Sequence, residues 1–381
     1  MDRRGGPSEM FLRGIAAYAR PSKPWVFTWE SPSVSGIERL LQVTPDGILG
    51  KHLDAKCLGL IQRAQIPLVC FGEAPTSPGV GSVDNDESAI GKMAAGYFMG
   101  RGYRHFGYYA TVEGAVDARC REFQTALRKL GHECQVAVTS ATPSHPSYAS
   151  TGSLTRELEE LRSWLLSLPQ PAAVLCASDN AALSATELCR ELGISVPEQI
   201  ALLGVDNDVP VCALAAPSLS SVQIAGERSG YVAANLLERM ALEGAPAEHI
   251  RLPPIRVVTR RSTEAIAAGD PSVARALIHL QANATDENCL RELFDTIGCS
   301  RRTLERKFRE SIGISPAQAW LRFRLEEAER LLAESELGME NVAYRSGFGK
   351  VRQLQVAFRR VLKQTPSHFR RNAVPSFRVP L

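Results

Sequence analysis

Two short helical segments near the end of the chain carry side chains suited to reading DNA bases. Arginine forks pair with guanine in the major groove, and glutamine pairs with adenine. The candidate contacts are Ser300, Arg301, Arg302, Thr303, Glu305, Arg306, Lys350, Arg352, Gln353 and Gln355. A solvated surface is the commoner explanation for any single arginine. Two such faces on two similar frames instead predict a site for double-stranded DNA.

The frame that would hold these residues is a duplication with a spacing of 50 residues. Hydrophobic anchors and helix starts both recur: Leu304 as Leu354, Phe308 as Phe358, Arg309 as Arg359, and Ser315-Pro316 as Thr365-Pro366. Ser or Thr followed by Pro is a typical helix start. Gly298 and Gly347 would make the turn of two helix-turn-helix units, and one long helix is predicted over 316–334. The copies are unequal, because Arg306 corresponds to Val356 and leaves the second helix with fewer base readers.

This C-terminal stretch resembles the DNA-binding domain of the AraC/XylS family. The matching pattern is Gly347-Phe348, Leu354, Phe358-Arg359, Thr365-Pro366 and Phe369-Arg370. The resemblance implies an all-α domain over 273–372, whose two recognition helices enter successive major-groove segments about one helical turn apart.

The distribution of charge along the chain indicates one domain that binds the phosphate backbone of a nucleic acid and one that does not. From Thr263 onward there are 19 Lys and Arg against 14 Asp and Glu, whereas the remainder has 25 against 27. A basic end on a slightly acidic body is typical of nucleic-acid binding. No apolar run is long enough for a membrane span, and no signal-peptide core follows the first residues. We therefore expect a cytoplasmic protein without a membrane partner.

Enzyme chemistry is not expected. The sequence has no P-loop, dinucleotide fingerprint, nucleophile elbow or metal-ligand cluster. Its nine cysteines lack paired spacing, which favours free, mostly buried thiols. We expect no cofactor and no metal. A sugar-transport module is the alternative from another class, but it would need a signal peptide and would lack the basic helical end.

The body of the chain alternates apolar runs with amphipathic stretches. Strands are predicted at 66–72, 106–109, 173–177 and 200–205, with helices between them. This alternation indicates an α/β fold with parallel sheets, in which ligands bind beyond the carboxyl ends of the strands. Residues 264–272 are expected to be a linker, and residues 373–381 a C-terminal tail.

The first 263 residues resemble the sensor of LacI/GalR regulators. The matching text is 102–106, 177–179, 204–207 and 254–263. The resemblance implies a two-lobed periplasmic-binding-protein-like fold that binds a sugar. Joined to the AraC/XylS-like domain, it implies a regulator activated by D-xylose that turns on genes for xylose catabolism. Another monosaccharide, or repression instead of activation, is the alternative.

Polar residues at the motif positions are the candidate sugar ligands. They are Asp84, Asn85, Arg121, Asp179, Asp206 and Asn207. Asp206 and Arg121 are favoured. Alternatively, Asp84 and Asp179 would cap the N-termini of helices. Arg121 would alternatively form an ion pair with Glu122 or another surface acid. Trp25 and Trp29 are suited to stacking on a sugar, although core packing is the commoner role of tryptophan.

One departure from the LacI/GalR pattern concerns the first strand. A helix is predicted over 9–19, but residues 1–8 cannot make the buried strand that precedes it in this family. Either the chain start was placed too late, so that the sensor here lacks that strand, or another element completes the sheet.

The resemblance also implies how the parts would work together. We expect a homodimer in which sugar closes the lobes of the sensor, favouring one placement of the DNA-binding domains beside RNA polymerase. Sugar and operator would then strengthen each other's binding by the same factor.

Overall fold

The protein is described from a computed structural model, which covers residues 6–19, 25–51, 53–72, 78–111, 118–139 and 151–373. The predicted tail from residue 374 onward lies outside this part. The chain divides into two compact units, which are treated separately below. The described residues of the first unit lie within 1–86 and 224–254, and those of the second lie within 87–223 and 255–373.

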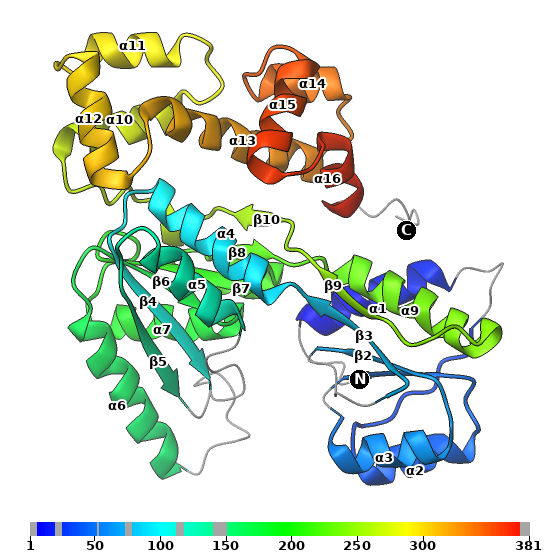
Figure 1. The fold of residues 1–381 in the computed structure, drawn as a ribbon. Coiled ribbons are helices and arrows are strands. Elements are labelled where there is room, and N and C mark those ends of the chain that lie inside the picture. The colour runs from blue at the N-terminus through cyan, green and yellow to red at the C-terminus, as the bar shows by residue number, and fades with distance from the viewer. Residues whose placement is uncertain are drawn as a thin grey trace. The chain divides into compact units, whose positions relative to one another are not determined.

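The first unit is a parallel sheet with helices on both faces (Figure 1). The strand order is β1-β2-β3-β9, with bounds Ile48–Lys51, Leu68–Phe71, Val80–Asn85 and His249–Leu252. The helices are α1 (Gly6–Tyr18), α2 (Val34–Gln42), α3 (Ala55–Arg63) and α9 (Gly226–Glu243). Helices α2 and α3 pack over a hydrophobic core that they share with β1, β2 and β3, and α1 packs against α9. A Cβ on Gly14 would lie 1.8 Å from the Glu227 carbonyl oxygen, so glycine permits this close helix pair.

The second unit contains a six-stranded sheet in the order β10-β8-β7-β6-β4-β5. All pairs are parallel except β10 with β8. The strands are β4 (His105–Thr111), β5 (Cys134–Thr139), β6 (Ala172–Cys176), β7 (Ile200–Asp206), β8 (Ser220–Gln223) and β10 (Arg256–Val258). The helices around it are α4 (Glu87–Gly100), α5 (Ala118–Arg128), α6 (Thr151–Ser167), α7 (Asp179–Glu191) and α8 (Val209–Leu214). Strands β6 and β7 are almost wholly buried, as expected of central parallel strands.

Seven helices follow the sheet within the second unit, and we call them the helical domain. They are α10 (Pro271–Ala282), α11 (Cys289–Thr296), α12 (Arg301–Ile312), α13 (Pro316–Glu334), α14 (Met339–Arg345), α15 (Val351–Leu362) and α16 (Pro366–Ala373). Helix α13 has the predicted bounds and begins with a capping box between Ser315 and Gln318. Helix α10 begins inside the segment predicted as a linker, where Asp270 caps it.

The predicted fold class is confirmed: α/β layers with parallel sheets are followed by an all-α domain. The four predicted strands correspond to β2, β4, β6 and β7. All nine cysteines are free, and seven of them are buried.

Candidate DNA interface and effector site

The first helix-turn-helix unit is built from α11 and α12. Gly298 makes the turn with a φ of 71°, a conformation that favours glycine. The Ser300 hydroxyl accepts a hydrogen bond from the Thr303 N–H at 3.2 Å and caps α12. Leu304 and Phe308 are fully buried. These contacts fix α12 by its apolar side and leave its opposite side exposed.

The second helix-turn-helix unit, built from α14 and α15, repeats this arrangement. Gly347 makes the turn with a φ of 78°, and Leu354 and Phe358 are buried as their counterparts are. Phe358 also packs edge-on against Phe369 of α16, with ring centroids 5.8 Å apart. Lys350 occupies the N-cap of α15, where its side chain makes no capping bond, and the residue is exposed.

Helix α13 connects the two helix-turn-helix units, and side-chain contacts also hold them together. Arg324 of α13 stacks between Trp320 and Phe348, with its guanidinium carbon 4.4 Å and 4.0 Å from the ring centroids, and donates to the Gly347 carbonyl. A Cβ on Gly347 would lie 2.7 Å from the Thr285 carbonyl oxygen, before α11. This close packing holds the two recognition helices, α12 and α15, in a fixed relation.

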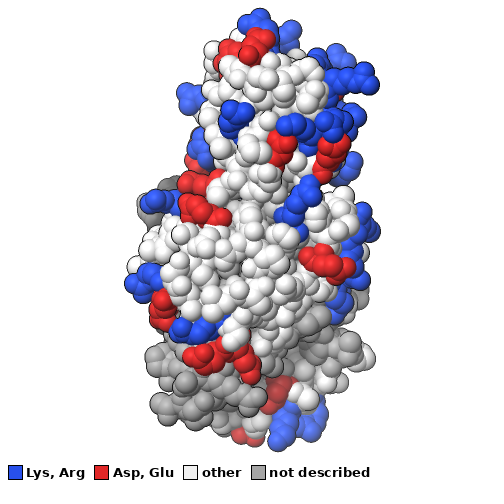
Figure 2. Space-filling view, turned by 90° about the vertical axis from the view of Figure 1, so that its left-hand side faces the viewer, with Lys and Arg blue, Asp and Glu red and all other residues white. Residues whose placement is uncertain are grey.

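The predicted DNA contacts lie on the outward sides of these helices. Thr303 and Glu305 are half-buried. The other eight are exposed: Ser300, Arg301, Arg302, Arg306, Lys350, Arg352, Gln353 and Gln355. Figure 2 shows basic side chains interleaved with acidic ones over the C-terminal helices at the top of the view. Their position on the outward sides of α12 and α15 supports the prediction that these residues contact DNA.

Ion pairs distinguish the arginines of α12. Arg301 pairs with Glu305 and Arg306 with Glu310, each at 2.9 Å and one helical turn apart. Arg302 has no such partner among the described residues, and neither does Arg352. These two occupy the same position in the duplication, 50 residues apart. This equivalence was missed in the sequence, where the repeat spacing alone would have revealed it.

At the carboxyl edge of the second sheet, Asp206 ends β7 and Asn207 follows it, both in strained backbone conformations. Their φ angles are 111° and 58°, which residues other than glycine rarely adopt. The Asn207 N–H donates to the Ser221 hydroxyl at 2.9 Å, and its side-chain oxygen accepts from Arg260 at 2.8 Å. Such strain at the ligand edge of a sheet is typical of a functional loop.

Asp179, at the start of α7, is only 1% exposed. Ser178 rather than Asp179 provides the N-cap of α7. One Asp179 carboxylate oxygen accepts the Asp208 N–H at 2.7 Å, while the other has no partner among the described residues. Burial raises the pKa of Asp179. The side-chain oxygen of Gln223, at the end of β8, is likewise buried without a partner in the described part of the chain. Buried polar atoms without partners call for an explanation, and a ligand is one.

In the first unit, Asp84 and Asn85 end β3, at the carboxyl edge of that sheet. Burial raises the pKa of Asp84 to about 6, opposed by a hydrogen bond from Ser82 at 3.3 Å. The other carboxylate oxygen of Asp84 is buried and lacks a partner among the described residues. Both candidates thus lie at a ligand edge, but in a different unit from Asp179, Asp206 and Asn207.

The predicted ligand arginine, Arg121, lies on the exposed side of α5, and Glu122, its predicted alternative partner, pairs with Lys92 at 3.5 Å. Arg119, two residues earlier, is buried instead. It pairs with Glu87 at 2.6 Å and donates to the Ala177 carbonyl beyond β6. Of the two arginines on α5, Arg119 is therefore the one that the structure brings to the carboxyl edge of the second sheet. Sequence reasoning missed it, although the buried Phe123 one turn later marks the same inward side of α5.

Helix α4 connects this edge to the helical domain. Its first residue, Glu87, holds Arg119, while Arg101 follows its last turn and pairs with Glu326 of α13 at 3.1 Å. Arg101 also stacks on Tyr97, 3.6 Å from the ring centroid. Nearby, Arg104 donates to the carbonyls of Glu310 and Ser311 at 2.6 Å and 2.7 Å, in the last turn of recognition helix α12. Positive charge suits the carboxyl end of a helix.

Within the described residues, no helix is long and apolar enough to cross a membrane. Nor does that part of the chain contain a group of three or more metal-ligating side chains.

Comparisons with known proteins agree with this architecture. Residues 95–263 match the periplasmic binding protein-like domain, and residues 293–372 match the helix-turn-helix domain. The chain joins these two domains. The expected resemblance is confirmed along nearly the whole chain, which is 25% identical to the xylose operon regulatory protein of Escherichia coli K12 over 94% of its own length and 92% of that protein.

Solved structures show the same fold. A xylose-binding transcription activator superposes with a TM-score of 0.56 at 23% identity, covering 97% of this chain and 96% of that one. A LacI-family regulator from Enterococcus faecium with bound ribose gives a TM-score of 0.57 at 18% identity, covering 70% of this chain and 96% of its own.

Proposed function

We propose that this protein is a transcription regulator that binds operator DNA through α12 and α15 and responds to a sugar, D-xylose. The observation that carries the proposal is the matched pair of exposed arginines, Arg302 and Arg352, on two packed helix-turn-helix units joined to a periplasmic binding protein-like domain. The names of the relatives support xylose as the effector and activation as the response.

The sugar site has its chemical basis at the carboxyl edge of the second sheet. Sugar hydroxyls both donate and accept hydrogen bonds, so carboxylates, amides and an arginine suit them. Asp206 would accept hydrogen bonds from sugar hydroxyls. So would one side-chain oxygen each of Asp179 and Gln223, for which the described part of the chain provides no hydrogen-bond partner. Arg119 would donate from the side of α5. Asp84 and Asn85, at the carboxyl edge of the sheet in the first unit, stay candidate sugar ligands of that unit.

Coupling between sugar and DNA would run along α4. A sugar hydroxyl that accepts a hydrogen bond from Arg119 would compete with Glu87, at one end of this helix, for the N–H donors of that arginine. The other end is tied to the helical domain by Arg101 and, just beyond, by Arg104. A shift of α4 would therefore move contacts on α13 and at the end of recognition helix α12. Arg256 of β10, which pairs with Glu334 at 2.6 Å, is a second tie to α13.

The wider assembly is part of the same proposal. A regulator of this kind acts in the cytoplasm, where the bacterial chromosome lies, as a homodimer on paired half-sites, and an activator contacts RNA polymerase. Catalysis has no place in this mechanism, in keeping with relatives that are transcription regulators.

The test combines a sugar panel with DNA selection. Thermal shift with D-xylose, L-arabinose, D-ribose and D-glucose is expected to show stabilisation by D-xylose above the others. Selection from random duplexes should then yield a sequence that the chain binds more tightly with D-xylose, and less tightly when Arg302 and Arg352 are both changed to Ala. No selected sequence at all would overturn DNA binding, whereas stabilisation by a different sugar would replace only the effector.

A further inference from the structure

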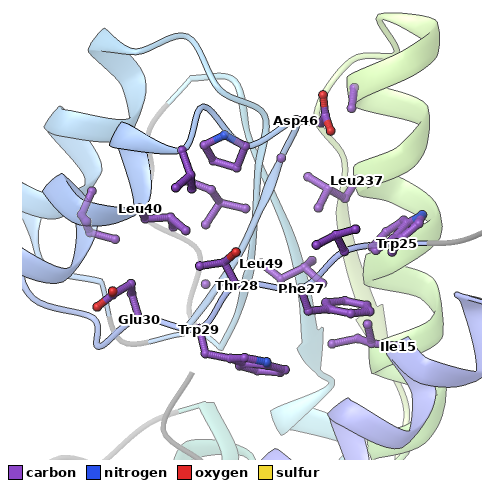
Figure 3. Close-up of a pocket in the computed structure, with 18 of the residues that line it drawn as sticks. Ile15, Trp25, Phe27, Thr28, Trp29, Glu30, Leu40, Asp46, Leu49 and Leu237 are labelled. Carbon is purple, nitrogen blue, oxygen red and sulfur yellow. The ribbon is translucent and has the colours of Figure 1, made fainter.

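Exposed aromatic side chains of the first unit gather around a cavity of about 720 Å³ beside β1 (Figure 3). Trp25 and Trp29, considered above as sugar-stacking residues, both line this cavity. Phe27 stacks on Trp29 with ring centroids 6.2 Å apart, and Trp25 packs against Tyr18 of α1 at 5.8 Å. Each of these partly exposed rings therefore has an aromatic neighbour within its own unit.

An exposed apolar residue of the helical domain lies in a different setting. Val356 of α15 is 58% exposed. The residues one helical turn before and after it are Arg352 and Arg360, and both are exposed. Valine is not favoured at an exposed helix position, because its branched Cβ is restricted against the preceding turn. Val356 thus presents an apolar surface between two cations on one side of α15.

The duplication indicates what Val356 faces. With the spacing of 50 residues, Val356 corresponds to Arg306 of α12, and Arg352 corresponds to Arg302. Both helices are held by a buried leucine and a buried phenylalanine at equivalent positions. Equivalent outward positions therefore point in equivalent directions within the two helix-turn-helix units. A surface that contacts Arg306 in the first unit is matched by one that contacts Val356 in the second.

The charge of α15 is suited to a close approach to DNA. Helix α12 carries Glu305 and Glu310, each in an ion pair with an arginine of the same helix. Helix α15 contains three arginines and no acidic residue, and the position of Glu310 is taken by Arg360. Helix α15 therefore lacks carboxylates that would repel the phosphates on either side of a groove.

The major groove offers one apolar group to such a helix. Along the edges of the base pairs, the C5 methyl group of thymine is apolar, whereas the other groups donate or accept hydrogen bonds. The side chain of valine can neither donate nor accept a hydrogen bond. The thymine methyl is therefore the base-edge group that matches it.

We propose that Val356 reads a thymine of the operator through contact with its C5 methyl group. This inference rests on the proposed function and adds a base-reading residue to it. Arg352 and Val356 are four residues apart, about 6 Å along the helix axis. The guanine that Arg352 reads and the thymine that Val356 reads should therefore lie within about two base pairs of each other, at ~3.4 Å per step.

The test removes the methyl group from the DNA and the two methyl groups from the protein. In the duplex that the wild type selects, each thymine in turn is replaced by deoxyuridine, which differs only at C5, and affinity is measured by fluorescence anisotropy. We expect a loss of about fourfold at one position, as for one buried CH₂ group. In Val356→Ala this loss should be absent. Val356→Arg should change the preferred base pair there from T·A to G·C.

A second valine of the same helix is the matched control. Val361 is 41% exposed but lies five residues further along α15, about 140° around the helix axis. Val361→Ala should keep the loss at the same thymine. Because both valines are exposed, thermal unfolding of the two variants should follow the wild type.

Two outcomes would overturn this inference and leave the proposed function intact. One is equal affinity of the wild type for the selected duplex and all of its deoxyuridine forms. The other is a deoxyuridine loss that is the same in Val356→Ala as in the wild type at every position. Failure to select any duplex would instead overturn the proposed DNA binding, and this inference with it.

Discussion

Arg101 and Glu326 form an ion pair across the boundary between the second sheet and the helical domain. Their nearest atoms lie 3.1 Å apart, and the arginine side chain is 1% exposed although the glutamate is about one-third exposed. The backbone carbonyl of Arg101 also accepts the Ala267 N–H at 2.9 Å, which binds the start of the connection to α10. A buried charge held by one oppositely charged partner resists rearrangement unless both groups move together.

Removing this pair should uncouple sugar from DNA. We expect wild-type coupling in the usual range of roughly 5–150-fold in operator affinity. In Glu326→Gln it should fall to within about twofold of none, because Arg101 loses its counter-charge. The measurement is operator affinity by fluorescence anisotropy with and without D-xylose.

Controls separate coupling from folding. Arg239→Ala breaks an exposed ion pair in the first unit, with Glu248 at 2.8 Å, and should leave the coupling unchanged. The exchanged pair Arg101→Glu with Glu326→Arg should restore part of the coupling. Full coupling in Glu326→Gln would show that the pair has only a structural role.

The two matched arginines should each read a base pair. Arg302→Ala and Arg352→Ala are expected to cost about 1–3 kcal/mol each in operator binding and to relax specificity at one position. Competition with single-base variants of the selected operator measures both effects. The exposed Arg190 of α7 supplies a control, and Arg190→Ala should change nothing. A uniform loss over all DNA sequences would instead make the arginine a phosphate contact.

The two arginines of α5 can be told apart by sugar affinity. Arg119→Met should weaken D-xylose binding more than tenfold, because a charged hydrogen bond contributes about 1.5–3 kcal/mol. Arg121→Met should change it less than twofold, since Arg121 lies on the exposed side of α5. Calorimetric titration of both variants, with thermal unfolding as the folding control, decides the matter. The reverse order of effects would restore the original prediction for Arg121.

Buried Glu329 of α13 should make stability depend on pH. Burial and the nearby Glu326 raise the pKa of Glu329 to about 8, and Arg256 opposes this. The folded chain therefore binds a proton that the unfolded chain releases above pH ~4.5, so stability should fall as pH rises from about 4.5 to 8. In Glu329→Gln this loss should be absent, which raises the free energy of unfolding at pH 9 by up to about 5 kcal/mol relative to the wild type.

Urea unfolding at pH 5 and pH 9 checks this prediction. The exposed Glu336 lies on the segment after α13, and Glu336→Gln should follow the wild type at both pH values. Identical pH dependence in Glu329→Gln and the wild type would contradict it.

The helical domain was the part most fully predictable from sequence. Its duplicated helix starts and turn glycines fix the boundaries locally, so α13 has the predicted bounds from Pro316 to Glu334. The buried strands of the second sheet were found for a similar reason, because continuous apolar runs between turn residues mark central parallel strands.

Other features depend on contacts that local patterns do not encode. Arg119 and Arg121 are two residues apart on a helix and so point in nearly opposite directions, and only packing shows which one is buried. The pair between Arg101 and Glu326 joins residues 225 positions apart in sequence. By contrast, the ion pairs of Arg301 and Arg306 have the i, i+4 spacing and were accessible to inspection.

The length of α4 is itself a constraint on how this chain can vary. Glu87 and Arg101 are attached to partners at opposite ends of one helix, so their angular relation is set by the residues between them. Inserting a single residue would turn Arg101 by about 100° around the helix axis and point it away from Glu326. Four inserted residues would nearly restore its direction but displace it by about 6 Å. Insertions are therefore expected to be tolerated in the loops around α4 but not within the helix, where the number of residues sets the direction in which Arg101 points.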